Sequence, residues 1–186
     1  DLKNDYGAMI WAQTINAIRD IVPLCTIEVL TPDFRNHAPS YKKVFEAHPD
    51  IFSHNIECVE YISKLVRPQS DWKRSLSLLE SSVKWGLKTK TGMMAGLGEK
   101  DSDILRTMRE ISDLGVEIFN IGQYLQPTRN HLSVHRFVHP SIFDMYKQKG
   151  LEMGFKVVES GPLVRSSYHA DEQAKLANIQ VDSLSV

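Results

Sequence analysis

Apolar residues along this chain alternate between helical spacing and short runs rich in β-branched residues. The first such pair is an amphipathic segment over residues 11–22, followed by a β-rich run at 26–30. The same alternation predicts further strands at residues 51–55, 89–95, 117–121 and 156–160. It predicts helices at residues 40–47, 57–63, 72–85 and 101–114, one that starts at His139-Pro140, and a last one from about Asp171. Five strands separated by helices indicate an α/β fold built from parallel βαβ units with right-handed crossovers.

The chain is expected to form one unit. It contains no internal repeat, low-complexity segment or linker, so residues 1–180 are assigned to one barrel-like domain and residues 181–186 to a frayed tail. The pattern does not decide between an open sheet and a closed one, and a partial barrel is the preferred interpretation. The chain starts without Met at Asp1 and leads straight into an amphipathic segment, which suggests a fragment of a longer protein.

Charge and cysteine content narrow the possible partners. The formal net charge is -1, so no global field attracts nucleic acid, and no apolar run approaches the roughly 18 residues that span a bilayer. Neither nucleic acid nor membrane is therefore expected as a partner. Cys25 and Cys58 match no zinc or cluster spacing and no disulfide framework; both are predicted to be buried, in a reducing compartment.

Polar strings follow each predicted strand. In parallel α/β folds the active site lies at the carboxyl ends of the strands, so these strings should meet at one rim. They are Thr31–Arg35, His54–Glu57, Gly96–Glu99, Gly122–Pro127 and Gly161–Ala170.

Each string also has a structural interpretation. Gly96–Glu99 is either a turn with a helix-start acid or a place where the backbone approaches a nucleotide. His54 and Asn55 are either turn formers or, with Glu57, partners of a ribose or an amino-acid headgroup. Both alternatives stay open on the residues alone.

Further arginines and histidines leave a similar choice between a structural and a functional role. Arg35 and Arg67 are either solvated surface charges or fixed forks for a carboxylate. The string Arg165-Ser166-Ser167-Tyr168 is either a loop with a capping serine or a site. Three histidines recur at every fourth position, but they lie in a loop bounded by prolines, so no metal site is expected at His131, His135 and His139.

Taken together, several strings resemble the lipoyl synthase family in order and spacing. The match covers nearly the whole chain except about the last ten residues, and the final string is the strongest. The strings are Glu28–Arg35, His54–Glu57, Val66–Pro68, Gly122–Pro127 and Gly161–Ala170.

The resemblance implies a partial (βα) barrel of the radical SAM type, truncated at its N-terminal side. It implies two 4Fe-4S clusters and S-adenosylmethionine as cofactors. A 5′-deoxyadenosyl radical would abstract hydrogen from a protein-bound octanoyl chain, and an auxiliary cluster would supply two sulfur atoms. The implied partners are an octanoylated lipoyl carrier protein or domain, such as the H protein or E2 subunits, and an electron donor such as flavodoxin or ferredoxin. The implied location is the cytoplasm in bacteria, and a mitochondrion or plastid in eukaryotes.

The resemblance also assigns roles to individual residues. The serine that binds the auxiliary cluster maps to Ser167, with Ser166 as the second choice, and Arg165 would keep that serine deprotonated or pair with a nearby charge. A hard serine oxygen suits iron less well than thiolates do, so the iron of the cluster that the serine binds should be released most easily. The S-adenosylmethionine site would be formed by Asn55, Glu57, Gly96, Gly98, Glu99 and Gln126.

The chain departs from the family in one major respect. The cysteine motifs that hold both clusters are absent, and Cys25 and Cys58 fit neither, so this chain alone should hold no cluster stably and should not catalyse. The alternatives are a cluster-less relative that only binds a lipoyl carrier domain or a nucleotide, and an ordinary αβ-barrel enzyme acting on a phosphorylated metabolite.

Overall fold

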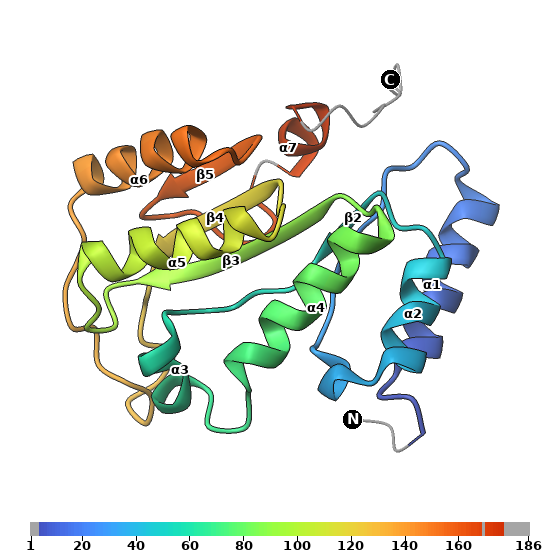
Figure 1. The fold of residues 1–186 in the computed structure, drawn as a ribbon, viewed down its shortest axis with the longest axis horizontal. Helices are drawn as coiled ribbons and strands as arrows, with labels where there is room; N and C mark the ends of the chain where they lie inside the picture. Colours follow the sequence, from blue (N-terminus) through green and yellow to red (C-terminus); the bar gives the residue numbers. More distant parts are fainter. Residues whose placement is uncertain (1–3, 169, 177–186) are drawn as a thin grey trace.

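The computed structural model describes residues 4–168 and 170–176, and the predicted tail at 181–186 lies outside the described residues. Five parallel strands form one sheet in the order β1-β2-β3-β4-β5, which confirms the predicted α/β topology. Within the described residues β1 and β5 are its two edges, so the sheet is an open, partial barrel (Figure 1). The strands are β1 (Glu28–Leu30), β2 (Ile51–Ser53), β3 (Thr89–Ala95), β4 (Ile118–Gln123) and β5 (Val157–Gly161).

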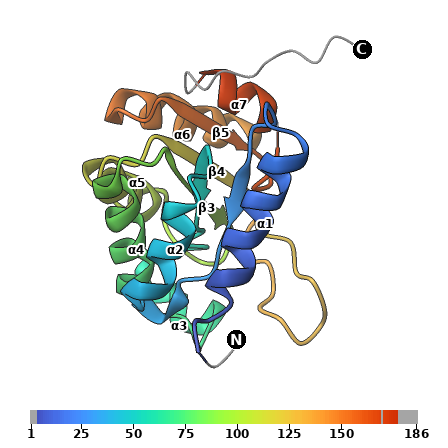
Figure 2. The same cartoon turned by 90° about the vertical axis from the view of Figure 1, so that its right-hand side faces the viewer.

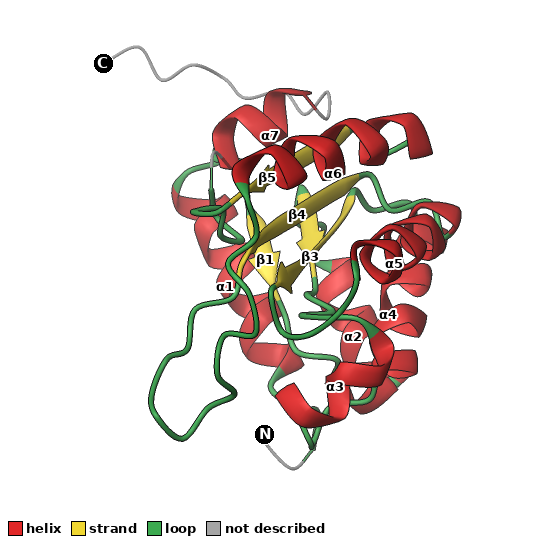
Figure 3. Cartoon of the chain, turned by 90° about the vertical axis from the view of Figure 1, so that its left-hand side faces the viewer, coloured by secondary structure: helices red, strands yellow, loops and turns green. Residues whose placement is uncertain are grey.

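Helices surround the strands, which lie at the centre of the molecule (Figure 3). They are α1 (Ala8–Ile21), α2 (Ala38–Glu46), α3 (Glu60–Val66), α4 (Trp72–Trp85), α5 (Asp101–Asp113), α6 (Pro140–Met153) and α7 (Ala170–Leu176), with a 3-10 turn η1 (Phe34–Asn36) after β1. Helices α1 and α2 pack side by side next to β1 (Figure 2).

Alternate strand residues point to opposite faces of the sheet. Many of those that face the helices are apolar and pack with helix residues into two cores, one that includes Phe52 and one that includes Phe119. The opposite face carries several polar or small residues: Ser53, Lys90, Gly92, Asn120 and Gly122. This face therefore offers polar groups and open space that a ligand could use.

The predicted helices and strands are present; α4 and β3 have the predicted bounds, and the ends of other elements differ by up to three residues. The helix predicted at 57–63 is wrong by three residues, because Glu57 adopts a left-handed φ of 70° and bonds to β3 instead of starting a helix. Strand β4 continues to Gln123 because its pairing with β3 extends to Ala95. The turn η1 was not predicted.

Candidate functional site

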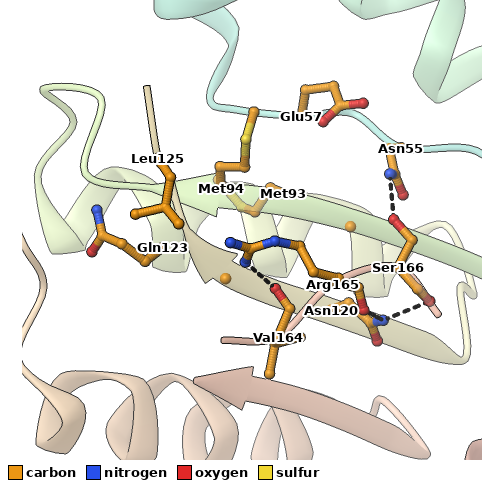
Figure 4. Close-up of a pocket in the computed structure, with 12 residues that line it drawn as sticks. Asn55, Glu57, Met93, Met94, Asn120, Gln123, Leu125, Val164, Arg165 and Ser166 are labelled. Carbon is orange, nitrogen blue, oxygen red and sulfur yellow. Dashed lines mark hydrogen bonds between the residues drawn. The ribbon is translucent and has the colours of Figure 1, made fainter. Parts of the chain in front are cut away.

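The carboxyl ends of β2, β3 and β4 surround a small cavity of about 180 Å³ (Figure 4). The segment that follows β5 crosses over it and closes one side. The residues that line the cavity are Asn55, Glu57, Gly92, Met93, Met94, Asn120, Gly122, Gln123, Leu125, Val164, Arg165 and Ser166.

Two asparagines hold the segment after β5 in place. The Asn120 side-chain amide donates to the carbonyl oxygens of Arg165 and Ser166, at 3.2 Å each. The Asn55 amide donates to the Ser166 hydroxyl at 2.9 Å (Figure 4). Ser166 is thus tied to β4 through its backbone and to the end of β2 through its side chain.

The close approach of this segment depends on Gly122. A Cβ atom at that position would come closer than 3.0 Å to the Val164 carbonyl oxygen and within 3.2 Å of the Arg165 guanidinium. Real Cβ atoms essentially never approach a backbone oxygen that closely, so only glycine lets the segment lie directly on β4.

Glu57 is held in an unusual backbone conformation. Its φ of 70° is rare for a residue with a side chain, and two hydrogen bonds to β3 maintain it: Glu57 N–H to Gly92 O at 3.1 Å, and Met94 N–H to Glu57 O at 2.8 Å. Conformations of this kind persist where the surroundings enforce them, and they concentrate at functional sites.

Burial raises the pKa of the Glu57 carboxyl, and the Arg67 guanidinium and the Asn55 side chain oppose part of that rise. The carboxyl lies 3.5 Å from Arg67 Nη1. Glu57 is therefore a fixed, partly desolvated acceptor whose charge is balanced by one neighbouring cation.

The side-chain oxygen of Asn120 is an unsatisfied hydrogen-bond acceptor within the described part of the chain. The residue is 3% exposed, and among the described residues its Oδ1 atom has no hydrogen-bond partner. Leaving a buried polar atom unpaired costs roughly 1–3 kcal/mol, so such an atom calls for an explanation. Because Asn120 lines the cavity, a hydrogen-bond donor of a ligand would satisfy it.

The structure brings together only part of the predicted site. Asn55, Glu57 and Arg165 line one cavity, and they are joined there by Ser166, the second choice for the cluster ligand. Ser167, the first choice, is exposed and does not line the cavity.

The Gly96–Glu99 string forms a turn. Glu99 is 4% exposed and accepts hydrogen bonds from the N–H groups of Gly96 and Leu97, at 2.6 and 3.0 Å. A Cβ at Gly96 would clash with the carbonyl oxygen of Arg136, so this glycine makes room for a neighbouring loop. Gly98 has a φ of 120°, which favours glycine for the turn itself. The geometry supports the structural interpretation of this string.

Gln126 also lies away from the cavity. It is exposed, and its amide donates to the His131 carbonyl oxygen at 2.8 Å within the long loop between β4 and α6. This loop projects away from the barrel (Figure 2). Gln126 therefore stabilises the loop.

Sequence reasoning did not single out Asn120 or Met94. Asn120 gave a detectable signal, because it is the one amide inside an otherwise apolar strand run, Ile118–Ile121. Met94 looks like an ordinary core residue in the sequence, and the strand register, which pairs it with Gly122, shows that it faces the cavity.

The remaining predictions concern metal ligands, cysteines and membranes. Across residues 4–168 and 170–176 there is no group of three or more His, Cys, Asp or Glu that could hold a metal ion. Cys58 is buried as predicted, but Cys25 is partly exposed, so the prediction for Cys25 is wrong: it follows α1 in a short connection outside both cores. No helix in the described part of the chain has the length and apolar character needed to cross a membrane.

The curated proteins that resemble this chain in sequence include several lipoyl synthases. No protein-family model matches the chain. A lipoyl synthase from Rubrobacter xylanophilus is 53% identical over 173 residues, which is 92% of this chain and 54% of that protein. Lipoyl synthases from Pseudomonas syringae and, as a mitochondrial protein, from Nematostella vectensis are 46% and 43% identical over 95% and 92% of this chain. They are covered over 56% and 59% of their own length, so the chain spans somewhat more than half of the curated relatives it matches.

A solved structure supports the fold. The crystal structure of methylornithine synthase (PylB) superimposes on 85% of this chain and 54% of that chain, with a TM-score of 0.61 and 10% identity. At this identity the likeness concerns the fold alone, and it agrees with the open, partial (βα) barrel seen here. With identities of 43–53% across nearly its whole length, the chain is homologous to curated lipoyl synthases over the part of those proteins that it spans.

Proposed function

We propose that the full-length protein is a lipoyl synthase, which inserts two sulfur atoms into the octanoyl chain on a lysine of a lipoyl carrier protein. The observation that carries the proposal is the 53% identity to a lipoyl synthase over 92% of the chain. The cavity of Figure 4 adds support, because four residues implied by the resemblance meet there: Asn55, Glu57, Arg165 and Ser166.

The cavity suits part of an S-adenosylmethionine molecule. The Asn55 amide and the Glu57 carboxylate can hydrogen-bond to ribose hydroxyls, and the unpaired Asn120 Oδ1 can accept one further hydrogen bond. Met94 and Leu125 supply apolar surface beside these polar groups. Because the backbone of Glu57 is fixed to β3, its carboxylate keeps one position.

The same cavity offers one oxygen ligand to an auxiliary iron–sulfur cluster. We propose Ser166 for this role rather than Ser167, since Ser166 lines the cavity and Ser167 is exposed. Arg165 lines the same cavity, and its guanidinium donates to the Val164 carbonyl oxygen at 2.6 Å, so it adds a positive charge to the cavity wall. One serine cannot hold a cluster, so the other ligands would lie outside the described residues. The clusters and S-adenosylmethionine would supply the radical chemistry and the sulfur.

The proposed partners are an octanoylated lipoyl carrier protein and a low-potential electron donor. The named relatives include bacterial proteins and a mitochondrial one, so we propose the bacterial cytoplasm or a mitochondrion as the location.

The proposed activity is tested on the full-length protein after cluster reconstitution. With S-adenosylmethionine, a reductant and an octanoylated carrier domain, mass spectrometry should show the carrier gaining two sulfur atoms and losing two hydrogens. Binding of the carrier without any sulfur gain, in protein that holds both clusters, would instead support a binding module.

The proposed role of Glu57 is tested separately. Glu57→Ala should weaken S-adenosylmethionine binding by about tenfold or more in an equilibrium titration, since it removes an ionic hydrogen-bond partner. Glu60→Ala is the matched control, because Glu60 is exposed at the start of α3 and does not line the cavity. Equal affinities for the two variants would remove Glu57 from the site.

A further inference from the structure

A second, larger cavity of about 690 Å³ lies at the carboxyl ends of β1 and β2 and is lined by three arginines. They come from three segments: Arg35 from η1, Arg67 from the end of α3, and Arg74 from α4. The sequence left Arg35 and Arg67 open as surface charges or as carboxylate forks. The structure places both at one cavity and adds Arg74.

The η1 turn presents Arg35 from a rigid frame. Phe34, Arg35 and Asn36 all have left-handed φ values, between 46° and 57°. Phe34 is 1% exposed and anchors the turn in the core. Asp33 accepts from the Arg35 N–H at 2.9 Å and from Arg74 Nε at 3.0 Å, so one carboxylate joins the turn to α4. Strained backbone that is held this firmly is typical of a binding site.

The charge balance at the cavity is positive. Asp33 is the carboxylate that lines it, and it pairs with Arg74. His54 also lines the cavity but adds no charge at neutral pH: its Nδ1 donates to the Thr31 carbonyl oxygen, and burial lowers the pKa of its imidazole. Arg67 is 48% exposed and lies 3.5 Å from the carboxylate of Glu57, at the border with the first cavity. Arg35 is exposed and stacks over the Tyr6 ring at 5.7 Å. Planar guanidinium groups in this arrangement match carboxylates geometrically.

We propose that this cavity binds an acidic segment of the protein substrate, with carboxylates received by Arg35, Arg67 and Arg74. The cavity is wide enough for several side chains and opens at exposed residues, which suits a protein segment better than a single carboxylate. Arg67 lines this cavity and lies 3.5 Å from Glu57, which lines the first cavity, so a partner that docks here lies next to Glu57. The identity of the partner as the acyl-bearing carrier rests on the proposed function.

The direct test uses a fluorescein-labelled peptide of six glutamates and the full-length protein. Arg35→Ala should weaken the peptide's affinity, measured by fluorescence anisotropy, by about tenfold. Arg106→Ala removes one positive charge from an exposed site on α5 that does not line this cavity, and it should leave the affinity within about twofold. Equal losses in the two variants, or no loss with Arg35→Ala, would overturn the proposal.

A kinetic arm separates this proposal from the proposed function. In lipoylation assays Arg35→Ala should raise KM for the carrier, more so at low salt, while kcat and the affinity for S-adenosylmethionine stay unchanged. A loss of S-adenosylmethionine affinity would assign the cavity to that molecule instead and refute acidic-segment binding. If the wild-type protein lacks lipoylation activity, the proposed function fails, and the peptide measurement still decides the cavity.

Discussion

Gly122→Ala should displace the segment that closes the cavity. The new Cβ would overlap the Val164 carbonyl oxygen, which would have to retreat by roughly 1 Å to reach ordinary contact. The hydrogen bonds from Asn120 to the carbonyl oxygens of Arg165 and Ser166 are already 3.2 Å long, so that movement would break them.

The magnitude follows from two costs. Losing two hydrogen bonds costs about 0.5–1.5 kcal/mol each, and the remaining overlap adds about 1–3 kcal/mol. If half of the total is relieved by local opening of the segment, the opening free energy falls by about 1–3 kcal/mol. That corresponds to about 5- to 150-fold faster amide exchange in residues 164–168.

Hydrogen–deuterium exchange followed by mass spectrometry measures this change. The matched control is Gly161→Ala on the neighbouring strand, where a Cβ would meet only a Val164 methyl group at an ordinary 3.5 Å. Lipoylation by the full-length protein should drop in the Gly122 variant and persist in the control. Indistinguishable exchange in the two variants would mean that Gly122 is not what permits the segment to lie on β4.

Three further predictions concern buried charge and thiol reactivity. Because burial raises the pKa of the Glu57 carboxyl, its contribution to stability is complete below the ordinary value of 4.5 and is lost as pH rises through the raised pKa. Glu57→Gln replaces the carboxylate by a neutral amide, so it should raise the unfolding free energy in urea at pH 7.5 but not at pH 4. Burial raises the pKa of the Cys58 thiol to about 12, so iodoacetamide should label Cys25 and spare Cys58 in the native protein, as peptide mass mapping would reveal. The Lys90 ammonium is 1% exposed and pairs with Glu28 at 2.9 Å, so Glu28→Ala should lower the unfolding free energy by about 3–5 kcal/mol in urea denaturation, and a loss below about 1 kcal/mol would contradict this.

Elements with local signals could be predicted from the sequence. Helix α4 has an Asp71 cap whose side chain accepts from the Arg74 N–H, and it ends at Gly86 with a φ of 89°. Both residue types are typical of helix ends, and the range predicted from the apolar pattern, residues 72–85, matches α4. The η1 turn has no such signal, because three residues with side chains take left-handed φ values there without a glycine.

Only the site residues that directly follow a strand could be predicted from the sequence. Asn55 and Glu57 follow β2 directly, so the rule for parallel sheets located them. Asn120 lies within β4, and only the parallel register and the returning segment bring it to Ser166. Glu99 sits at a strand end too, but its carboxylate is used by its own turn. The position of a residue at a strand end shows where its side chain lies. The hydrogen bonds of that side chain decide whether it remains available to a ligand.

We propose that the segment after β5, which lies on β4, presents Ser166 rather than Ser167 at the cofactor site. The most direct measurement compares Ser166→Ala with Ser167→Ala in the reconstituted full-length protein, by iron content, S-adenosylmethionine cleavage and lipoyl product. We expect Ser166→Ala to lose the iron of one cluster and to lose sulfur insertion while cleavage continues, and Ser167→Ala to resemble the wild type. The reverse pattern, or full sulfur insertion by Ser166→Ala, would contradict the account.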